Sequence, residues 1–360
     1  MSRRTWPVAG VLLAGLLSLP RAQLDAGPPC ACSHPWAGVY PLVLLPYGCG
    51  GAVDEASLEA QLRYQLAGGV SGVTVLGSIG EGEEATPEVR EQMIRTTVRV
   101  VHGCVPVVVG VHTCDVAVAT AQVLTAKMLG ASAVLVKYKG DPSASGCRVL
   151  AFFRQLSDLA ALPIFYYHYP GDTGLKLSPE ELARIVRLPG VVGAKISTLN
   201  LKEFAELVAR TRGCGKAYLS GTALSLTQFL DAGGHGAMCP EATLLPGATV
   251  SAYRHYCEGR YEAARAAQEE LFVLAPLIRG GLTTEGIARK KVMLTQDLGL
   301  RLPVQDSHPQ ARLKAALDRL GVPTSARVSC PLPGLSAHDR ALVDRAVSKI
   351  RERHPAGVAP

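Results

Sequence analysis

The chain of 360 residues lacks the features that mark several common protein classes. Aromatic residues make up only 5% of it, so the basic residues near its two ends have few aromatic neighbours and indicate solvated helix faces rather than a nucleic-acid surface. The 37 glycines follow no short period and no solenoid repeat is present, which argues against fibrous and repeat proteins. The hydrophobic fraction of 48% instead predicts a globular protein with a sizeable core.

The apolar run 8–19 is too short to span a bilayer and has the length of a signal-peptide core. The preceding pair Arg3 and Arg4 resembles a bacterial twin-arginine export signal. We therefore expect residues 1–30 to form a signal peptide with a Pro-rich leader, and the mature protein to be periplasmic or extracellular without a membrane anchor. The alternatives are a mitochondrial presequence, since no acidic residue precedes Asp25, and a cytoplasmic location.

Ten cysteines follow this apolar run. Their even number would allow them to pair in an oxidising compartment, but their scattered spacing does not define the pairs. Cys30 and Cys32 are the only close pair, and they lie in a Pro-rich segment that lacks the other two ligands of a structural zinc site. The sequence therefore predicts no structural zinc site.

From Trp36 onward, short Val/Leu/Ile-rich segments alternate with longer segments of helical periodicity. Eight segments are predicted strands: 38–45, 72–76, 105–110, 133–138, 163–167, 191–195, 217–220 and 235–239. Eight βα units predict an α/β fold of the (β/α)8 TIM-barrel type, because a doubly wound sheet usually has fewer strands and a Gly-rich dinucleotide turn after the first. We assign the barrel to residues 31–258 and a C-terminal helical extension to residues 259–360.

Helix signals support this alternation. Thr86 and Ser178 each precede a proline, which is typical of helix N-caps, and Glu181 stands where a capping box requires an acid. Beyond residue 246 the periodicity predicts helices near 253–274, 287–298, 310–320 and 337–351.

Lys195 ends the apolar strand segment 191–195, where packing provides no reason for an amine. Burial lowers the pKa of a lysine. An unprotonated amine is what a carbonyl substrate needs to form a Schiff base. The alternative is a strand-end lysine whose ammonium group reaches solvent.

Three other groups follow strand ends, which in a barrel build the active site. The turn that begins Gly77-Ser78-Ile79 offers backbone N–H groups and a hydroxyl to a carboxylate. Lys137 and Lys139 share one face of the fourth strand. The fifth strand ends in tyrosines, one of which is suited to relay protons beside a Schiff-base lysine. Taken singly, each group is also compatible with a structural role, as a tight turn, an exposed loop or aromatic packing.

The order of these motifs resembles the N-acetylneuraminate lyase and dihydrodipicolinate synthase family of pyruvate-dependent class I aldolases, over roughly residues 36–300. The resemblance implies that Lys195 forms the Schiff base with a 2-oxo acid and that Tyr167 is the catalytic phenol. It implies that Ser78, with the adjoining backbone N–H groups near Gly77, holds the carboxylate. It further implies a barrel that needs neither cofactor nor metal, assembled as a homo-oligomer, a tetramer or dimer.

The chain departs from the family pattern in its polar groups. Ile79 replaces a hydroxyl residue, and Lys139 stands where many members place a tyrosine contributed across a subunit contact. Asp172 stands where dihydrodipicolinate synthases carry an arginine for the carboxylate of their aldehyde, and would repel that substrate. Ala223 and Leu224 replace the acidic residues with which sialic acid lyases hold sugar hydroxyls. His168, by contrast, follows Tyr167 as in the lyases.

The leading hypothesis is a Schiff-base lyase that joins or separates pyruvate, or a related 2-oxo acid, and an unidentified aldehyde. We expect the second substrate to carry an anionic group recognised by Lys139. A hydro-lyase acting on a deoxy sugar acid through the same imine remains open, as does a family-derived binding protein without turnover. A metal-dependent aldolase would need three protein ligands. His112 and His168 end strands, but His235 lies toward the wrong end of its strand.

Overall fold

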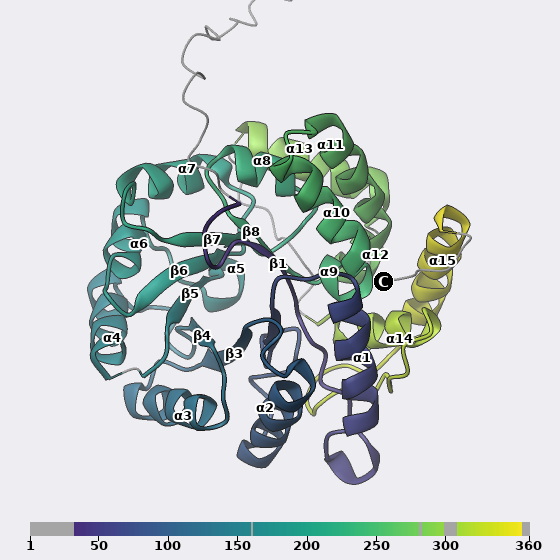
Figure 1. The fold of residues 1–360 in the computed structure, drawn as a ribbon, viewed down its shortest axis with the longest axis horizontal. Coiled ribbons are helices and arrows are strands. Elements are labelled where there is room, and N and C mark those ends of the chain that lie inside the picture. The colour runs from purple at the N-terminus through teal and green to yellow at the C-terminus, as the bar shows by residue number, and fades with distance from the viewer. Residues whose placement is uncertain (1–31, 160, 281–282, 299–307, 355–360) are drawn as a thin grey trace, which may run out of the picture.

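A computed structural model describes residues 32–159, 161–280, 283–298 and 308–354. The predicted signal peptide and leader, 1–30, lie outside the described residues. Eight parallel strands form one sheet in the order β1-β8-β7-β6-β5-β4-β3-β2. The sheet curls into a barrel whose first and last strands meet through a parallel bridge between Leu42 and Thr74. Helices surround the strands (Figure 1), so the predicted (β/α)8 barrel is confirmed.

Each predicted strand is present, with ends that differ by a few residues. The strands are β1 Gly38–Pro41, β2 Val73–Val75, β3 Val107–His112, β4 Ala133–Lys137, β5 Ile164–His168, β6 Val191–Ile196, β7 Ala217–Ser220 and β8 Gly236–Cys239. The largest difference is in β1, which was expected to continue to residue 45. Beyond Pro41, the backbone N–H of Leu42 donates to the Thr243 hydroxyl at 3.0 Å rather than to a strand.

The helices of the barrel are α1 Glu55–Ala67, α2 Pro87–Val101, α3 Val116–Met128, α4 Gly146–Leu159, α5 Pro170–Thr173, α6 Pro179–Val186, α7 Leu201–Arg210, α8 Leu226–Asp231, α9 Glu241–Leu244 and α10 Pro246–Cys257. A 3-10 turn, η1, spans Cys49–Gly51. Both predicted caps are confirmed: Thr86 accepts from the Val89 N–H, and Ser178 forms a capping box with Glu181.

The C-terminal region is helical, as expected. Its elements are α11 Tyr261–Glu270, the 3-10 turn η2 Leu271–Leu274, α12 Ala275–Arg279, α13 Glu285–Leu298, α14 Gln310–Arg319 and α15 Ala337–Arg353. The single helix predicted for 253–274 is wrong. Gly259 has a φ of 74°, a left-handed conformation that glycine adopts readily and that ends one helix before the next begins.

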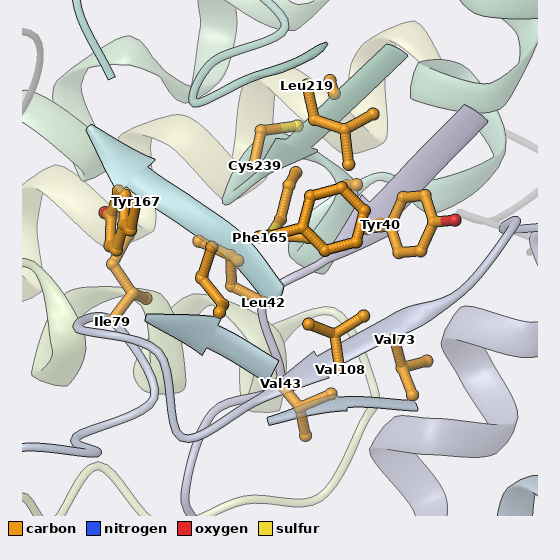
Figure 2. Close-up of a cluster of buried hydrophobic side chains, with 14 of the residues drawn as sticks. Tyr40, Leu42, Val43, Val73, Ile79, Val108, Phe165, Tyr167, Leu219 and Cys239 are labelled. Atoms are coloured by element: carbon orange, nitrogen blue, oxygen red, sulfur yellow. The ribbon is translucent and has the colours of Figure 1, made fainter. Parts of the chain in front are cut away.

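The barrel interior is filled by apolar side chains that alternate along the strands (Figure 2). In that view Tyr167 and Ile79 lie at one end of the cluster, and Tyr40 and Val73 lie toward the other. Both Tyr40 and Tyr167 are buried. Because the interior is packed with apolar side chains, we look for polar functional groups at the end of the barrel where Tyr167 lies.

Two long-range links join distant parts of the chain. Cys32 and Cys257 form a disulfide, with Cα atoms 5.9 Å apart, between the start of the described chain and the end of α10. Lys314 of α14 forms a buried ion pair with Glu81, which follows β2. Of the helices in the described ranges, none is long and apolar enough to cross a membrane.

Candidate active site

Lys195 lies on β6 between Tyr167 of β5 and Leu219 of β7 in the strand register. The residue is 2% exposed, and its Nζ lies 4.2 Å from the centroid of the Tyr167 ring. Burial, assisted by the positive charge of Lys137, lowers the pKa of Lys195 to about 7. A substantial fraction of this amine is therefore neutral at physiological pH, which is the form that attacks a carbonyl.

Two neighbours of Lys195, Cys239 and Glu241, oppose the lowering of its pKa without cancelling it. Burial raises the pKa of the Cys239 thiol well above its usual range, so the sulfur carries no negative charge near neutral pH. The Glu241 carboxylate is already engaged, because it accepts from the Thr222 hydroxyl at 2.6 Å and from the Ala223 N–H at 3.1 Å. Within the described part of the chain, no carboxylate forms an ion pair with Lys195.

Tyr167 supplies a buried phenol beside this amine. Burial raises its pKa, against the effect of hydrogen bonds with the Ser197 and Ser78 side chains. Its ring stacks on Tyr169, with centroids 5.8 Å apart. A phenol that stays protonated beside a neutral amine is placed to give a proton to a carbonyl oxygen and to take one back.

The turn after β2 is held in shape from several sides. Leu76 and Glu81 both have a φ of 56°, a left-handed conformation that residues other than glycine rarely adopt. Glu81 is anchored by Lys314 and by the Ser329 N–H and hydroxyl at 2.6 and 2.7 Å. Such contacts maintain a strained turn, and strained backbone is found disproportionately at functional sites.

Ser78 lies in this turn, next to the buried Gly77. The Ser78 hydroxyl accepts a hydrogen bond from Lys137 Nζ at 2.8 Å, and its backbone carbonyl accepts one from Gln310 at 3.2 Å. A Cβ added to Gly77 would meet no heavy atom within 4 Å. The turn therefore borders open space, as a seat for a substrate carboxylate requires.

Four charged residues, here called the charge cluster, lie beside this turn: Lys137, Lys139, Glu83 and Asp172. Lys137 forms short ion pairs with both carboxylates. Lys139 Nζ lies 2.6 Å from Asp172 Oδ1 and 3.6 Å from Glu83 Oε2. Burial favours a raised pKa for Glu83, but the two lysines prevail and hold that pKa below its usual range.

These ion pairs correct one sequence-based argument. That argument treated Lys139 as a cation available to a substrate anion and Asp172 as an acid that repels one. Because Asp172 contacts both lysines of the cluster, its charge is compensated and the charge of Lys139 is already engaged. The formal charges of the four groups cancel.

Two other expected site residues take different positions, Ile79 near Tyr167 and His168 on the other face of β5. Ile79 is buried and lies in the apolar cluster, near Tyr167 in Figure 2. His168 belongs to the opposite face of β5 from Tyr167, since neighbouring strand residues alternate. The His168 ring contacts Tyr166, whose own ring packs on Phe153 of α4. The structure therefore brings Lys195, Tyr167 and Ser78 together and leaves His168 outside that group.

The histidines of the metal hypothesis are separated. His112 donates from Nε2 to the Leu76 carbonyl at 2.8 Å, and His235 packs on His34 with ring centroids 5.1 Å apart. Over the ranges that the structure describes, no three His, Cys, Asp or Glu side chains form a group suited to a metal.

Sequence reasoning missed two acids of the site. Glu83 lies two residues beyond Glu81 of the turn after β2, and no local pattern distinguishes it from a solvated residue at the start of a helix. Glu241 directly follows the end of β8, so the rule that active sites form at the carboxyl ends of barrel strands would have found it.

Comparison with known proteins agrees with this geometry. Residues 35–306 match the Dihydrodipicolinate synthetase family. The chain belongs to this family. It is similar to the 4-hydroxy-tetrahydrodipicolinate synthase of Methanospirillum hungatei JF-1, with 30% identity over 292 residues that cover 78% of this chain and 98% of that protein.

Solved structures share the fold. The crystal structure of dihydrodipicolinate synthase from Thermotoga maritima is 26% identical, with a TM-score of 0.75, and the alignment covers 88% of this chain and 99% of that one. A prophage protein of the dihydrodipicolinic acid synthase family from E. coli K12, solved in complex with pyruvate, has the same TM-score and coverage at 20% identity, which bears on fold alone. Membership of this family supports assignment to the lyases.

Proposed function

We propose that this family member is a Schiff-base-forming lyase that makes or breaks a carbon–carbon bond beside the carbonyl group of pyruvate or a related 2-oxo acid. The observation that carries the proposal is the environment of Lys195, a buried amine that forms no ion pair with any residue the structure describes and lies 4.2 Å from the centroid of the ring of a buried tyrosine. Family membership supports it, because the matched relatives are synthases of this class.

The neutral amine of Lys195 attacks the keto carbon, and the carbonyl oxygen takes a proton from Tyr167. The phenolate then recovers a proton from the nitrogen. Tyr167 then gives its proton to the new hydroxyl, which leaves as water, and the products are the protonated imine and the Tyr167 phenolate. The backbone N–H groups of the turn that contains Ser78 hold the 2-oxo acid's carboxylate.

In the cleavage direction, the protonated imine accepts the electron pair of the adjacent carbon–carbon bond and becomes an enamine. The hydroxyl that becomes the aldehyde oxygen loses its proton to Tyr167. Ala223 and Leu224 are fully buried and carry no polar side-chain group that could hold sugar hydroxyls, which supports an aldehyde other than a polyhydroxylated sugar. An anionic group on that substrate would have to compete with Asp172 for Lys139.

The proposal is tested by trapping the imine. The protein is incubated with pyruvate and other 2-oxo acids, reduced with borohydride and examined by intact-mass and peptide analysis. We expect one adduct per chain on Lys195, none in Lys195→Ala, and an unchanged yield in Lys202→Ala, which removes an exposed lysine of α7. No adduct with any 2-oxo acid, or an adduct that persists in Lys195→Ala, would overturn the assignment.

We also propose that the mature protein acts outside the cytoplasm. The disulfide between Cys32 and Cys257 supports this location, because such bonds persist in oxidising compartments. Mass analysis of protein purified from its native source should find residues 1–30 removed, and native cytosolic protein that retains them would contradict the proposal. The expected homo-oligomer is checked by light scattering on the same sample.

A further inference from the structure

Lys137 is a second buried lysine at the same end of the barrel, and the reaction described above does not use it. It is fully buried at the end of β4. Its Nζ donates to Ser78 Oγ, pairs with Glu83 and Asp172, and lies 5.6 Å from the centroid of the Tyr167 ring. Burying an ammonium ion is costly, and packing alone would favour an apolar side chain here.

The direction of the Lys137–Ser78 hydrogen bond constrains the serine. An ammonium group has three hydrogens and no acceptor, so Ser78 Oγ must be the acceptor in this bond. The hydroxyl hydrogen of Ser78 is then left to donate elsewhere. Its neighbours include the phenol of Tyr167, with which the Ser78 side chain also interacts.

The positive charge of Lys137 also favours the phenolate form of Tyr167. During imine formation Tyr167 is a phenolate between the moment it protonates the carbonyl oxygen and the moment it takes a proton from the nitrogen. A phenolate in a buried site is unfavourable unless donors and a positive charge face it. Glu83 and Asp172, whose side chains are 24% and 27% exposed, hold the ammonium in place but leave Ser78 as its third partner.

We propose that Lys137 is the positioning residue of the reaction: it makes Ser78 a hydrogen-bond donor toward the oxygen of Tyr167 and stabilises the phenolate that forms there. This inference rests on the proposed function. All members of the arrangement belong to one chain, so the phenol is supported without a residue from a neighbouring subunit.

The test compares rates of imine formation. We expect Lys137→Met and Ser78→Ala each to slow pyruvate imine formation about ten- to a hundred-fold, the range for loss of a buried charge-assisted contact. The double variant should be no slower than the slower single variant, because the two residues act as one unit. Lys216→Met is the control and should retain the wild-type rate. Lys216 is a half-buried lysine whose Nζ donates to the backbone carbonyls of Leu188 and Val191.

A second readout separates positioning from folding. Loss of the nearby positive charge should move the pH midpoint of imine formation upward in Lys137→Met, and Lys137→Arg should restore it. Lys137→Met leaves the two carboxylates with Lys139 as their one cation in the charge cluster. The triple variant Lys137→Met/Glu83→Gln/Asp172→Asn removes this imbalance of charge, and it should be as slow as Ser78→Ala.

The outcomes distinguish this inference from the assignment of function. If the wild-type protein forms no adduct on Lys195, the proposed function fails. If it forms the adduct and the Lys137 variants keep both the rate and the pH midpoint, or if the losses in the double variant add, Lys137 serves only the fold and this inference is overturned.

Discussion

Two lysines at the same end of the barrel, Lys195 of β6 and Lys137 of β4, are equally buried but differ in their surroundings. Lys195 faces an aromatic ring and a protonated thiol, and its pKa falls to about 7. Lys137 faces two carboxylates. Burial therefore does not decide what a lysine does, and we propose that the presence of a counter-ion distinguishes a fixed cation from a nucleophile.

A third buried lysine, Lys314, extends the comparison. It pairs with Glu81 and thereby joins α14 to the turn after β2. Burial lowers its pKa, and the Glu81 carboxylate opposes that effect. Lys314 lies outside the reacting group, so its ion pair serves the fold and the shape of the turn. One barrel thus uses buried lysines in three ways, and the partner distinguishes them.

The largest expected effect follows from removing both counter-ions of Lys137. The double variant Glu83→Gln/Asp172→Asn should lose about 3–5 kcal/mol in the free energy of unfolding, because it removes both carboxylates that pair with the buried ammonium of Lys137. Urea unfolding at pH 7 measures the change. A loss below about 1 kcal/mol would show that the ion pairs of Lys137 contribute little to stability. Counter-ions would then not explain the difference between Lys137 and Lys195.

Lys195 should make stability depend on pH in a defined direction. Its folded pKa of about 7 lies below the ordinary value of 10.5, so the unfolded chain binds more protons between these pH values. The free energy of unfolding should therefore increase with pH there, by up to about 1.4 kcal/mol per unit from this group. The free energy of unfolding is measured against pH for the wild type and for Lys195→Met, and the difference between the two curves gives the contribution of Lys195. Parallel curves would contradict the lowered pKa of Lys195.

Imine formation should follow the neutral fraction of the same amine. With a pKa of about 7, the initial rate with pyruvate should rise about five-fold from pH 6 to pH 7 and only about two-fold from pH 7 to pH 8. Rapid borohydride quenching across this range measures it. A rate that keeps rising tenfold per pH unit through pH 9 would indicate that Lys195 is not perturbed.

The smallest effect is expected at Lys139. Its side chain is 32% exposed, and Asp172 keeps Lys137 as a partner when Lys139 is removed. Lys139→Met should cost less than about 1 kcal/mol in urea unfolding, as is typical of partly exposed ion pairs. If Lys139→Met loses as much free energy of unfolding as the Glu83→Gln/Asp172→Asn variant, Lys139 rather than Lys137 is the lysine that stabilises the charge cluster.

The sequence predicted the barrel well, and it placed Lys195 and Tyr167 near the ends of the strands on which the structure has them. The alternation of short apolar segments with helical periodicity located all eight strands, since parallel strands buried on both faces read as continuous apolar runs. Lys195 stood out because an amine interrupts such a run. The break at Gly259 was missed because helical periodicity continues across a single left-handed residue.

The polar surroundings of the reacting pair were less predictable. Asp172 and Lys139 were both noted, but as separate charges, since their contact joins residues 33 positions apart in the chain. Glu83 carried no local signal. His168 shared a motif with Tyr167 and was expected beside it, whereas the strand's alternation directs the two side chains to opposite faces.

By itself, the sequence determined the order of strands and helices, the position of Lys195 at a strand end and the tyrosine beside it, because these depend on local periodicity and on adjacent strands. Only the tertiary structure decided which carboxylates meet which lysines, that Cys32 pairs with Cys257, and that Lys314 reaches Glu81. Electrostatic contacts act over a few ångströms between residues distant in the chain, so they exist only once the barrel has closed.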